Sequence, residues 1–437
     1  MKNCLQNHNN FGVRNNCKEC KRKVGLLTLD SHSYNYGGLL QGYALLNAIR
    51  NVGYVCEIID YDMQSEPRTF SGKRNIKYLT PEAIIIRIKK RLELHKHKNK
   101  LCVEEIIENR KKAFDEFRRI HMNFSICCDR SGLFQLQDNY DAIVCGSDQI
   151  WNPGMNLPSF FLDFVDDKRE KVIYAASIGR NMLSKEEKKV YGKYLTGLKH
   201  ISVREEKAKE LIEDILTETS SAVEDGRFGK AGNTSIDDSV GHSRQTEVAV
   251  LMDPTLLINA ASWKGIAREN TLVKEKYMFC YFLGLTEEKR NSAISFAKKH
   301  GLKIISIPYL LEKYNALDDG FSEERFPVGP AEFLNLILHA EFVLTDSFHA
   351  SVFSILFNKR FRVFGRSSGK DNMNSRIDTL LGYIGKNEYL IEPGQLDDSY
   401  IEEDIDYDFS IINEKRELSI KWLSDHIKGR YNMQDDK

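Results

Sequence analysis

The chain has 437 residues, 41% of them hydrophobic, and its 63 lysines and arginines balance its 63 aspartates and glutamates. This length predicts two domains with full-sized cores. A formal net charge of zero argues against nucleic acid as a partner, because nonspecific binding to a phosphate backbone needs a broad basic surface. No stretch approaches roughly 18 consecutive apolar residues, so we expect no transmembrane helix.

Residues 1–22 are polar and lack the apolar core of a signal peptide, so we expect a flexible tail and a cytoplasmic protein. The nine cysteines are an odd number scattered along a large chain, which fits reduced thiols better than a disulfide framework. Cys17 and Cys20 form a C-x-x-C motif, but no second ligand pair stands at matching spacing, so we expect no metal there. The role of this motif stays open.

From residue 23 onward, short apolar runs alternate with amphipathic segments, which is typical of a parallel α/β sheet. The spacing predicts a strand over 23–29, a helix over 39–52 and a strand over 55–59. The loop before this helix ends in Gly37 and Gly38, which let a ligand approach backbone N–H groups at the positive end of a helix. An ordinary turn between strand and helix is the alternative.

Residues 81–122 are typical of one or two long helices, with a basic patch at 94–100 between their segments. This patch predicts contact with anionic lipid head groups, peripherally at the inner face of a membrane, or with a phosphate-bearing acceptor. A solvated helix face is the alternative.

A strand over 140–145 leads into the loop 146–153, which is rich in groups that hydrogen-bond hydroxyls. These polar side chains are Ser147, Asp148, Gln149 and Asn152. Trp151 in the same loop offers a flat face on which a sugar ring can stack. A buried aromatic at a turn is the alternative for Trp151.

The next predicted strand, 171–176, ends at Ser177 and Gly179, and a helix is expected over 184–198. Arg204 then stands at another strand end, where its guanidinium can pair with a carboxylate or a phosphate. A surface salt bridge to a following glutamate, Glu205 or Glu206, is the alternative.

Residues 217–247 are rich in small and charged residues and poor in apolar ones, which predicts a disordered surface insertion. A strand over 248–252 follows and ends at Asp253, and residues 263–275 form the expected crossing to a second domain.

The second domain repeats the alternation, and its central stretch is 341–364. A buried strand at 342–344 is followed by Asp346 and Ser347, which are preferred helix N-caps, so His349 falls in the first turn of a helix. Ligands of open α/β sheets sit at such strand ends. A satisfied polar group near a helix cap is the alternative for His349. Arg376 opens a later helix, and an acidic segment precedes a last amphipathic helix, 411–427.

The predicted fold class is α/β, with two Rossmann-like doubly wound domains facing each other across a cleft, as in GT-B glycosyltransferases. We expect an N-terminal domain over 23–265, a C-terminal domain over 276–395, and an acidic segment with the last helix over 396–437. A C-terminal helix often returns to the first domain in that architecture.

Several motifs in order resemble those of the polysaccharide pyruvyl transferase family, from about residue 23 to about residue 381. They are Tyr36-Gly-Gly-Leu-Leu-Gln41-Gly-Tyr-Ala, Gly146-Ser-Asp-Gln-Ile-Trp151, Ala176-Ser-Ile-Gly179, Ile201-Ser-Val-Arg-Glu-Glu206, Asp253-Pro-Thr-Leu-Leu, Val328-Gly-Pro-Ala-Glu-Phe and Thr345-Asp-Ser-Phe-His349. Two departures are Ala350, where the family usually has glycine, and the length of the segment 217–247.

The resemblance implies an enzyme that moves the enolpyruvyl unit of phosphoenolpyruvate onto a sugar of a surface polysaccharide or its lipid-linked precursor, forming a pyruvate ketal and releasing phosphate. By motif match His349 is the general acid, Arg204 the first choice and Arg376 the second for gripping the donor, and Asp148 the acceptor of a hydroxyl proton. No metal or other cofactor is expected, because arginines and helix dipoles can neutralise the donor.

The other positions that the resemblance assigns to substrate binding lie in the same motifs. In the N-terminal domain, on the acceptor side, they are Asn35, Gly37, Gly38, Gln41, Gly146, Ser147, Gln149, Trp151, Ser177 and Gly179. In the C-terminal domain, on the donor side, they are Asp346, Ser347, Phe348 and Arg376.

Two other functions remain open at this point. A glycosyltransferase with a nucleotide-sugar donor shares the predicted architecture, and a carbohydrate-binding protein with a vestigial site shares the polar loops. The sequence does not specify the acceptor sugar, the linkage or stereochemistry of the ketal, or the oligomeric state.

Overall fold

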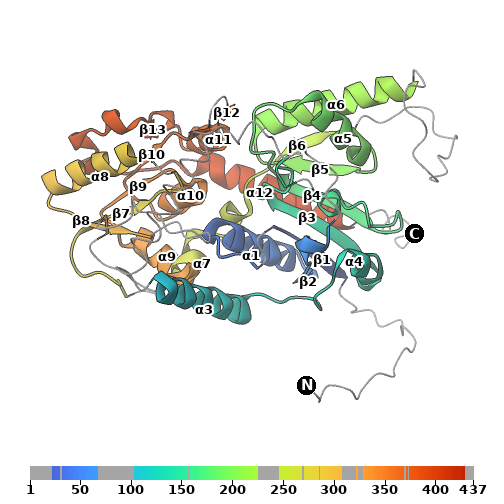
Figure 1. Cartoon of the computed structure of the whole chain (residues 1–437), viewed down its shortest axis with the longest axis horizontal. Helices are drawn as coiled ribbons and strands as arrows, with labels where there is room; N and C mark the ends of the chain where they lie inside the picture. The colour runs from blue at the N-terminus through green and yellow to red at the C-terminus, as the bar shows by residue number, and fades with distance from the viewer. Residues whose placement is uncertain are drawn as a thin grey trace, which may run out of the picture.

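A computed structural model describes residues 22–29, 32–66, 103–155, 157–224, 246–267, 270–284, 286–307, 321–322, 328–368, 371–372 and 374–428. The predictions for residues 1–21, which include Cys17 and Cys20, and for the basic patch at 94–100 lie outside the described residues. Within the described part, two parallel sheets with flanking helices lie side by side (Figure 1).

The first sheet has six parallel strands in the order β2-β1-β3-β4-β5-β6. The strands are β1 (Lys23–Leu27), β2 (Val55–Ile58), β3 (Ala142–Asp148), β4 (Glu170–Ala176), β5 (His200–Val203) and β6 (Val248–Val250). Helices α1 (Tyr36–Asn51), α3 (Val103–His121), α4 (Arg130–Leu136), α5 (Lys185–Leu195) and α6 (Glu206–Glu224) connect them. Apolar side chains leave both faces of the strands: Val144 packs into the core shared with α1, and Ile143 packs into the core shared with α5.

The second sheet has five strands in the order β13-β10-β9-β7-β8. They are β7 (Tyr277–Tyr281), β8 (Lys303–Ser306), β9 (Phe342–Thr345), β10 (Phe361–Phe364) and β13 (Leu390–Ile391), and β11 (Ser367–Ser368) with β12 (Asp371–Asn372) forms a separate antiparallel pair. The helices are α7 (Ala260–Ala267), α8 (Glu287–Lys299), α9 (Pro330–Leu338), α10 (Phe348–Leu356), α11 (Ser375–Gly382) and α12 (Ser410–Lys428). Short 3-10 turns are η1 (Met63–Ser65), η3 (Gln137–Asn139), η4 (Pro158–Phe161), η5 (Pro254–Leu256), η7 (Asn387–Tyr389), η8 (Pro393–Gln395) and η9 (Asp398–Ile401).

The strand order of each sheet reverses direction once, and that point locates its ligand-binding crevice. In the first sheet the chain runs outward from β1 to β2 and then continues on the other side of β1 with β3. In the second sheet β7 stands in the same way between β8 and β9. Ligands of doubly wound folds bind at the carboxyl ends of the strands at such a point. The predicted fold class, two Rossmann-like domains in a GT-B-like arrangement, is confirmed.

Two helices extend beyond their predicted limits. Helix α1 begins at Tyr36, earlier than expected, because the Asn35 side chain caps it by accepting a hydrogen bond from the Gly38 N–H. Gly37 and Gly38 therefore belong to the first helical turn, and placing them in the loop was wrong. Helix α6 continues to Glu224, so the predicted insertion is helical at its start, and residues 225–245 lie outside the described part.

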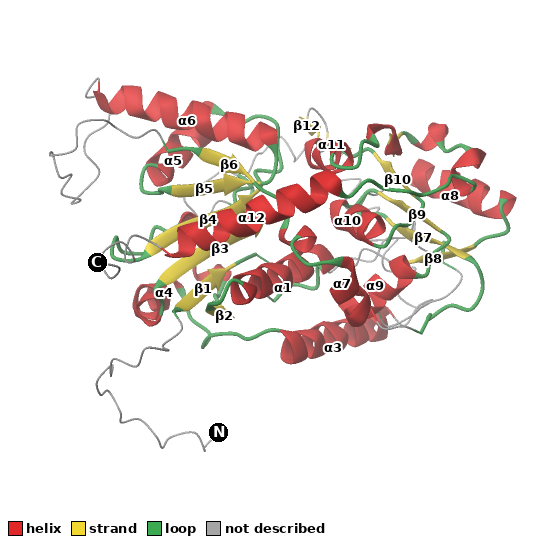
Figure 2. Ribbon diagram, turned by 180° about the vertical axis from the view of Figure 1, so that it is seen from behind, coloured by secondary structure: helices red, strands yellow, loops and turns green. Residues whose placement is uncertain are grey.

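The last helix, α12, lies against the first sheet, as expected for this architecture (Figure 2). The Met252 N–H donates to the Ser419 hydroxyl at 3.2 Å, and Arg416 Nε donates to the Leu256 carbonyl at 2.7 Å. The Trp422 ring packs near Tyr174 of β4, with centroids 6.4 Å apart. These contacts attach the end of the chain to the N-terminal domain.

Tyr36 joins the two domains from the N-terminal side. Its ring stacks on Phe333 of α9, with centroids 4.6 Å apart and planes 13° apart, and it meets Tyr281 of β7 edge-on. Its hydroxyl donates to the Val328 carbonyl at 2.6 Å. Burial raises the pKa of Tyr36 to about 12, so the hydroxyl remains a donor at neutral pH. Apolar residues of both domains thus form one continuous core.

None of the described helices combines the length and the apolar composition that a membrane span requires.

Replacing Gly265 by alanine is expected to raise the free energy of unfolding by about 0.5–1 kcal/mol. The urea concentration at the unfolding midpoint should rise accordingly. Gly265 lies inside α7, and a Cβ atom there meets no atom within 4 Å. Gly53 is the matched control, because its φ of +101° is unfavourable for alanine even though the space is also open. Urea denaturation followed by tryptophan fluorescence should show opposite shifts for the two variants, and equal shifts would contradict this reading of the two backbones.

Candidate active site

A cavity of about 380 Å³ opens where the crevices of the two sheets face each other. The N-terminal domain lines it with residues that follow β1 and β3, namely Leu29, Asn35, Gly37, Asp148, Gln149, Asn152, Gly154 and Met155. The C-terminal domain contributes Tyr281, Leu283, Phe333, Ser347, Phe348, His349, Arg366 and Arg376. Eight of the residues predicted from the sequence therefore meet at one cavity: Asn35, Gly37, Asp148, Gln149, Ser347, Phe348, His349 and Arg376.

Helices α1 and α10 both begin at this cavity. Their N-caps, Asn35 and Ser347, are on its wall, and each cap accepts a backbone N–H of the first turn. The positive ends of two helices thus converge on one space, which favours an anionic ligand. Ala350 is accommodated as an ordinary residue of the first turn of α10, where its N–H donates to the Ser347 hydroxyl.

His349 reaches the cavity from the first turn of α10 and is 7% exposed. Its Nε2 atom is buried, has no hydrogen-bond partner among the described residues and lies 3.7 Å from Oδ2 of Asp253. The other face of the ring meets helix α1, because a Cβ atom at Gly37 would stand 2.0 Å from Nδ1. The alternative of a satisfied polar group near a cap is therefore wrong.

Arg204 is buried behind the cavity and lies within ion-pair distance of three carboxylates, although its Nε makes no hydrogen bond to any described residue. Nη1 lies 2.5 Å from Asp253, Nη2 lies 3.2 Å from Asp148, and Nε lies 3.8 Å from Glu205. Burial opposes the charged form of Arg204, but these three carboxylates raise the pKa of the guanidinium above its ordinary value. Of the expected alternatives, the pairing with Glu205 is present, but it is buried rather than on the surface.

Asp253 is the carboxylate that Arg204 and His349 share. Its Oδ1 accepts the Thr255 N–H at 3.0 Å and the Thr255 hydroxyl at 2.6 Å. Burial disfavours its charge, yet His349 and Arg204 hold the pKa of Asp253 well below its ordinary value. The sequence placed Asp253 at a strand end but gave it no role. The position after a strand, which singled out Asp148, was the signal available for it.

Arg376 differs from Arg204 because it has no carboxylate within ion-pair distance among the described residues. With the Gln149 amide oriented so that its oxygen faces the guanidinium, that oxygen accepts from Nη1 at 3.0 Å and Nη2 at 3.2 Å. Burial and the neighbouring charge of Arg204 lower the pKa of Arg376 to about 10. A bound anion would relieve both penalties.

The Phe348 ring lies close to both guanidiniums. The Cζ atoms of Arg204 and Arg376 lie 4.6 Å and 6.0 Å from its centroid. Cation–π attraction places both cations without bringing them into contact.

Several predicted substrate-binding residues instead hold the loop that carries Asp148. The Gln41 amide donates to Thr28 at 2.7 Å and to the Gly38 carbonyl at 3.0 Å, and it accepts the Ser147 N–H at 3.0 Å. The Ser147 hydroxyl donates to the Ala175 carbonyl, and a Cβ atom at Gly146 would stand 2.1 Å from the Tyr174 carbonyl oxygen. These residues are buried behind the cavity wall, so assigning them to substrate contact was wrong.

The prediction that Trp151 stacks on a sugar was also wrong. Its indole is 1% exposed, donates Nε1–H to the Phe160 carbonyl at 3.1 Å and stacks on Phe161 at 5.2 Å between centroids. The alternative, a buried aromatic at a turn, is confirmed.

Ser177, Gly179 and Asp346 have structural roles as well, and assigning them to the substrate was wrong. The Ser177 hydroxyl donates to Glu205 at 2.6 Å, and Gly179 has a φ of +68° that lets its loop pass close to Gln149. Asp346 accepts the Leu283 N–H at 2.6 Å and is paired with the buried Lys289 at 2.9 Å. It therefore joins the ends of β7 and β9 below the cavity.

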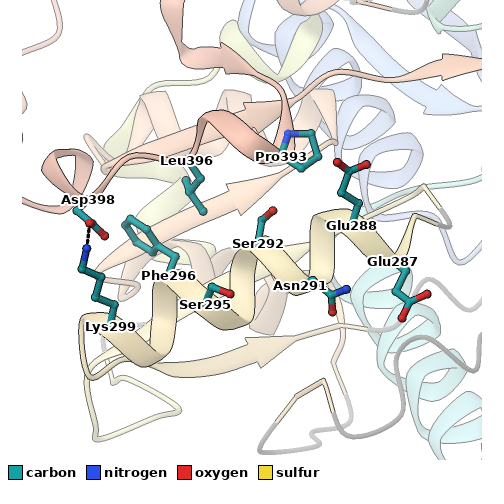
Figure 3. A pocket seen from close by; sticks show the side chains of 10 residues that line it. All are labelled: Glu287, Glu288, Asn291, Ser292, Ser295, Phe296, Lys299, Pro393, Leu396 and Asp398. Carbon is teal, nitrogen blue, oxygen red and sulfur yellow. Dashed lines mark hydrogen bonds and ion pairs between the residues drawn. The ribbon is translucent and has the colours of Figure 1, made fainter.

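A second hollow of about 780 Å³ runs along α8, between residues such as Glu288 and Ser292 and the segment from Pro393 to Asp398 (Figure 3). No predicted site residue lines it. Within the described ranges, no group of three or more His, Cys, Asp or Glu side chains is arranged to hold a metal ion.

The fold and site define a two-domain α/β protein whose interdomain cavity is lined by an imidazole and by guanidinium groups. A family model described as polysaccharide pyruvyl transferase matches residues 35–223 and 238–368, which is more than half of the chain. The chain therefore belongs to the polysaccharide pyruvyl transferase family.

Solved structures with similar overall folds are sugar-nucleotide enzymes of low sequence identity. A putative UDP-N-acetylglucosamine 2-epimerase from Listeria monocytogenes is 10% identical, with a TM-score of 0.47, over 90% of this chain and 94% of its own. The UDP-GlcNAc 2-epimerase of Methanocaldococcus jannaschii is 14% identical, with a TM-score of 0.47, over 92% and 99%. The E. coli heptosyltransferase WaaC is 10% identical, with a TM-score of 0.33, over 82% and 99%. A comparison with curated proteins gave no match.

Replacing Gly37 by alanine is expected to displace the His349 ring, because the new Cβ atom would stand 2.0 Å from Nδ1. We expect a loss of about 1–3 kcal/mol of stability, as for an overpacked core site. Gly42→Ala in the same helix is the control, since the nearest described atom to its Cβ would be Thr28 Cγ2 at 3.3 Å. Thermal unfolding and a crystal structure of each variant provide the measurement. An unmoved imidazole in the Gly37 variant would contradict the packing described.

Proposed function

We propose that the protein transfers the enolpyruvyl unit of phosphoenolpyruvate to a sugar hydroxyl and closes a cyclic pyruvate ketal, with release of phosphate. Membership of the pyruvyl transferase family supports the transferase class. One observation supports the choice of donor: the buried Arg376, which has no carboxylate within ion-pair distance in the described part of the chain, and the imidazole of His349 line the same cavity, at the N-termini of α1 and α10. A small molecule with a carboxylate and a phosphate supplies the charge that this space lacks.

The size of the cavity supports a small donor. Its volume of about 380 Å³ is near the lower end of the roughly 300–1,000 Å³ that ligand pockets occupy. We assign Arg376 and Arg366 to the donor, because both line the cavity from the C-terminal domain. The order of preference drawn from the sequence, Arg204 before Arg376, is reversed in this proposal, because Arg204 already faces Asp253 and Asp148.

In the proposed reaction, the protonated imidazole of His349 gives its proton to the methylene carbon of phosphoenolpyruvate. The adjacent carbon becomes oxocarbenium-like, and a sugar hydroxyl attacks it while Asp148 accepts the hydroxyl proton. The carbon–oxygen bond to phosphate then breaks, and phosphate leaves with the bonding electrons. A second hydroxyl of the sugar attacks the same carbon, loses its proton and closes the ketal.

The acceptor in this proposal enters along the N-terminal wall of the cavity. Gln149 and Asn152 offer amides there, and Asp148 keeps 13% of its side chain exposed while one oxygen pairs with Arg204. These groups suit the vicinal hydroxyls of a sugar, free or lipid-linked, through directional hydrogen bonds. Asp148 is thus held close to the hydroxyl whose proton it accepts.

Replacing His349 by glutamine is expected to lower phosphate release from phosphoenolpyruvate by about 10²–10⁴-fold, as for loss of a general acid. Phosphate is measured across a panel of free and lipid-linked sugars. His300→Gln is the matched control, because His300 pairs with Asp398 and neither residue lines the cavity. Undiminished turnover by the His349 variant would remove the proposed mechanism.

Thermal unfolding, sugar binding and phosphate release of the wild-type protein distinguish this function from its alternatives. Protection against thermal unfolding by phosphoenolpyruvate supports the proposal. Protection by a nucleotide or nucleotide-sugar but not by phosphoenolpyruvate would identify a glycosyltransferase. Sugar binding without phosphate release for any acceptor would identify a carbohydrate-binding protein.

Replacing Arg376 by glutamine is expected to raise the KM for phosphoenolpyruvate by about 10–100-fold, because a charge-assisted pair with the donor is lost. Arg376→Lys keeps the charge but not the planar guanidinium, so its KM should lie between the values of the wild type and of the glutamine variant. Arg169→Gln, at a surface pair with Asp138, is the control. Steady-state kinetics provide the measurement, and an unchanged KM in the glutamine variant would return the donor to Arg204.

A further inference from the structure

We propose that Asp253 is the positioning residue of His349: its carboxylate faces Nε2 of the imidazole, and Nδ1 is the nitrogen that passes a proton to the substrate. This inference rests on the proposed function in giving His349 the role of the acid. The placement of the carboxylate and of the two ring nitrogens can be tested without turnover.

The two nitrogens of the ring have different surroundings. Nε2 is buried with no hydrogen-bond partner, and the Asp253 oxygen at 3.7 Å is the carboxylate that faces it. Nδ1 adjoins Gly37, and both Gly37 and His349 line the cavity. Hydrogen bonds between catalytic groups are often long before the substrate binds and shorten in the complex. A small approach of the ring would therefore bring Nε2–H onto the carboxylate and leave Nδ1 facing the substrate.

Glycine at position 37 lets helix α1 pack against the imidazole. Any side chain there would begin with a Cβ atom 2.0 Å from Nδ1 and 2.6 Å from Cε1 and from Cγ, which places that atom over the face of the ring. The lack of a Cβ atom at this position thus allows the ring to lie against the helix with Nε2 on the side of Asp253.

Asp253 is built as a fixed negative charge. Two hydrogen bonds from Thr255 hold Oδ1, and the Arg204 guanidinium holds Oδ2 at 2.5 Å. Arg204 is itself held by Asp148 and by the Phe348 ring. A carboxylate with this many partners cannot rotate away from the imidazole.

Charged side chains from several elements surround His349. They are Asp253 after β6, Arg204 after β5, Asp148 at the end of β3, Arg366 after β10 and Arg376 in α11. Within the described residues, Asp253 is the carboxylate within ion-pair distance of His349. It is thus the acidic group placed to orient the ring.

The pairing also crosses the cleft. Asp253 belongs to the N-terminal domain and His349 to the C-terminal domain, so the acid is complete when the two domains are closed on each other. The simpler reading is that Asp253 is only the counter-ion of Arg204, and the following experiment distinguishes the two.

The test is the titration of His349 by ¹H–¹⁵N NMR in the substrate-free protein, with its signal identified by its loss in His349→Gln. In Asp253→Asn the midpoint should fall by about one pH unit or more, because an opposite charge nearby favours the protonated ring. Thr255→Val is the matched control, since it removes a hydrogen bond to the same carboxylate but keeps the charge. An equal midpoint in wild type and Asp253→Asn would overturn the proposal.

A second measurement needs no variant of Asp253. Long-range ¹H–¹⁵N correlations in the wild-type protein above the midpoint should show the remaining ring proton on Nε2. A proton on Nδ1 would overturn the assignment of the two nitrogens even if Asp253→Asn failed to fold.

The pH–rate profile connects this pair to the reaction. The alkaline limb of kcat/KM should move to lower pH by the same amount in Asp253→Asn, and it should stay in place in Thr255→Val. An unmoved limb in Asp253→Asn would overturn the proposal. If the NMR midpoint shifts but wild type releases no phosphate with any acceptor, the proposed function fails while the pairing of Asp253 with His349 stands.

Discussion

The buried ion pair between Arg204 and Asp253 is the interaction on which the site depends. A buried guanidinium is costly unless its charge and its hydrogen-bond donors are matched. Here the matching carboxylates follow β3 and β6, on either side of the strand that carries Arg204. The pairing of Arg204 with both carboxylates therefore fixes the carboxyl ends of β3, β5 and β6 relative to one another. The same carboxylate faces the imidazole from the other domain, so the requirement extends across the cleft.

Two guanidiniums in one site thus have different electrostatic states. Arg204 is paired with protein carboxylates, whereas Arg376 has no carboxylate within ion-pair distance among the residues that the structure describes. The ion pairs of Arg204 stabilise the fold. The guanidinium of Arg376 can instead pair with an anionic ligand. Burial lowers the pKa of Arg376, and an anion bound beside it would offset this effect.

The architecture was predictable because buried parallel strands have near-continuous apolar sequences, as in Phe342 to Leu344, and because their alternation with helices specifies a doubly wound sheet. The motif residues at strand ends marked the cavity for the same reason. The incorrect predictions concern the direction in which side chains point and the partners that they meet. Nothing local to Trp151 shows that its Nε1–H meets the Phe160 carbonyl, and the role of Asp253 depends on partners from β5 and from the other domain. Gly37 was predicted to be a loop residue. The imidazole that requires a glycine at this position lies more than three hundred residues away in the sequence.

The position of helix α12 has a consequence for folding during synthesis on the ribosome. It covers the face of β4 that carries Tyr174, yet it is the last described helix to be synthesised. The first domain therefore emerges with an apolar strip that its own sequence cannot cover, and it stays uncovered until the second domain has been translated. Such a nascent chain is a natural client for chaperones.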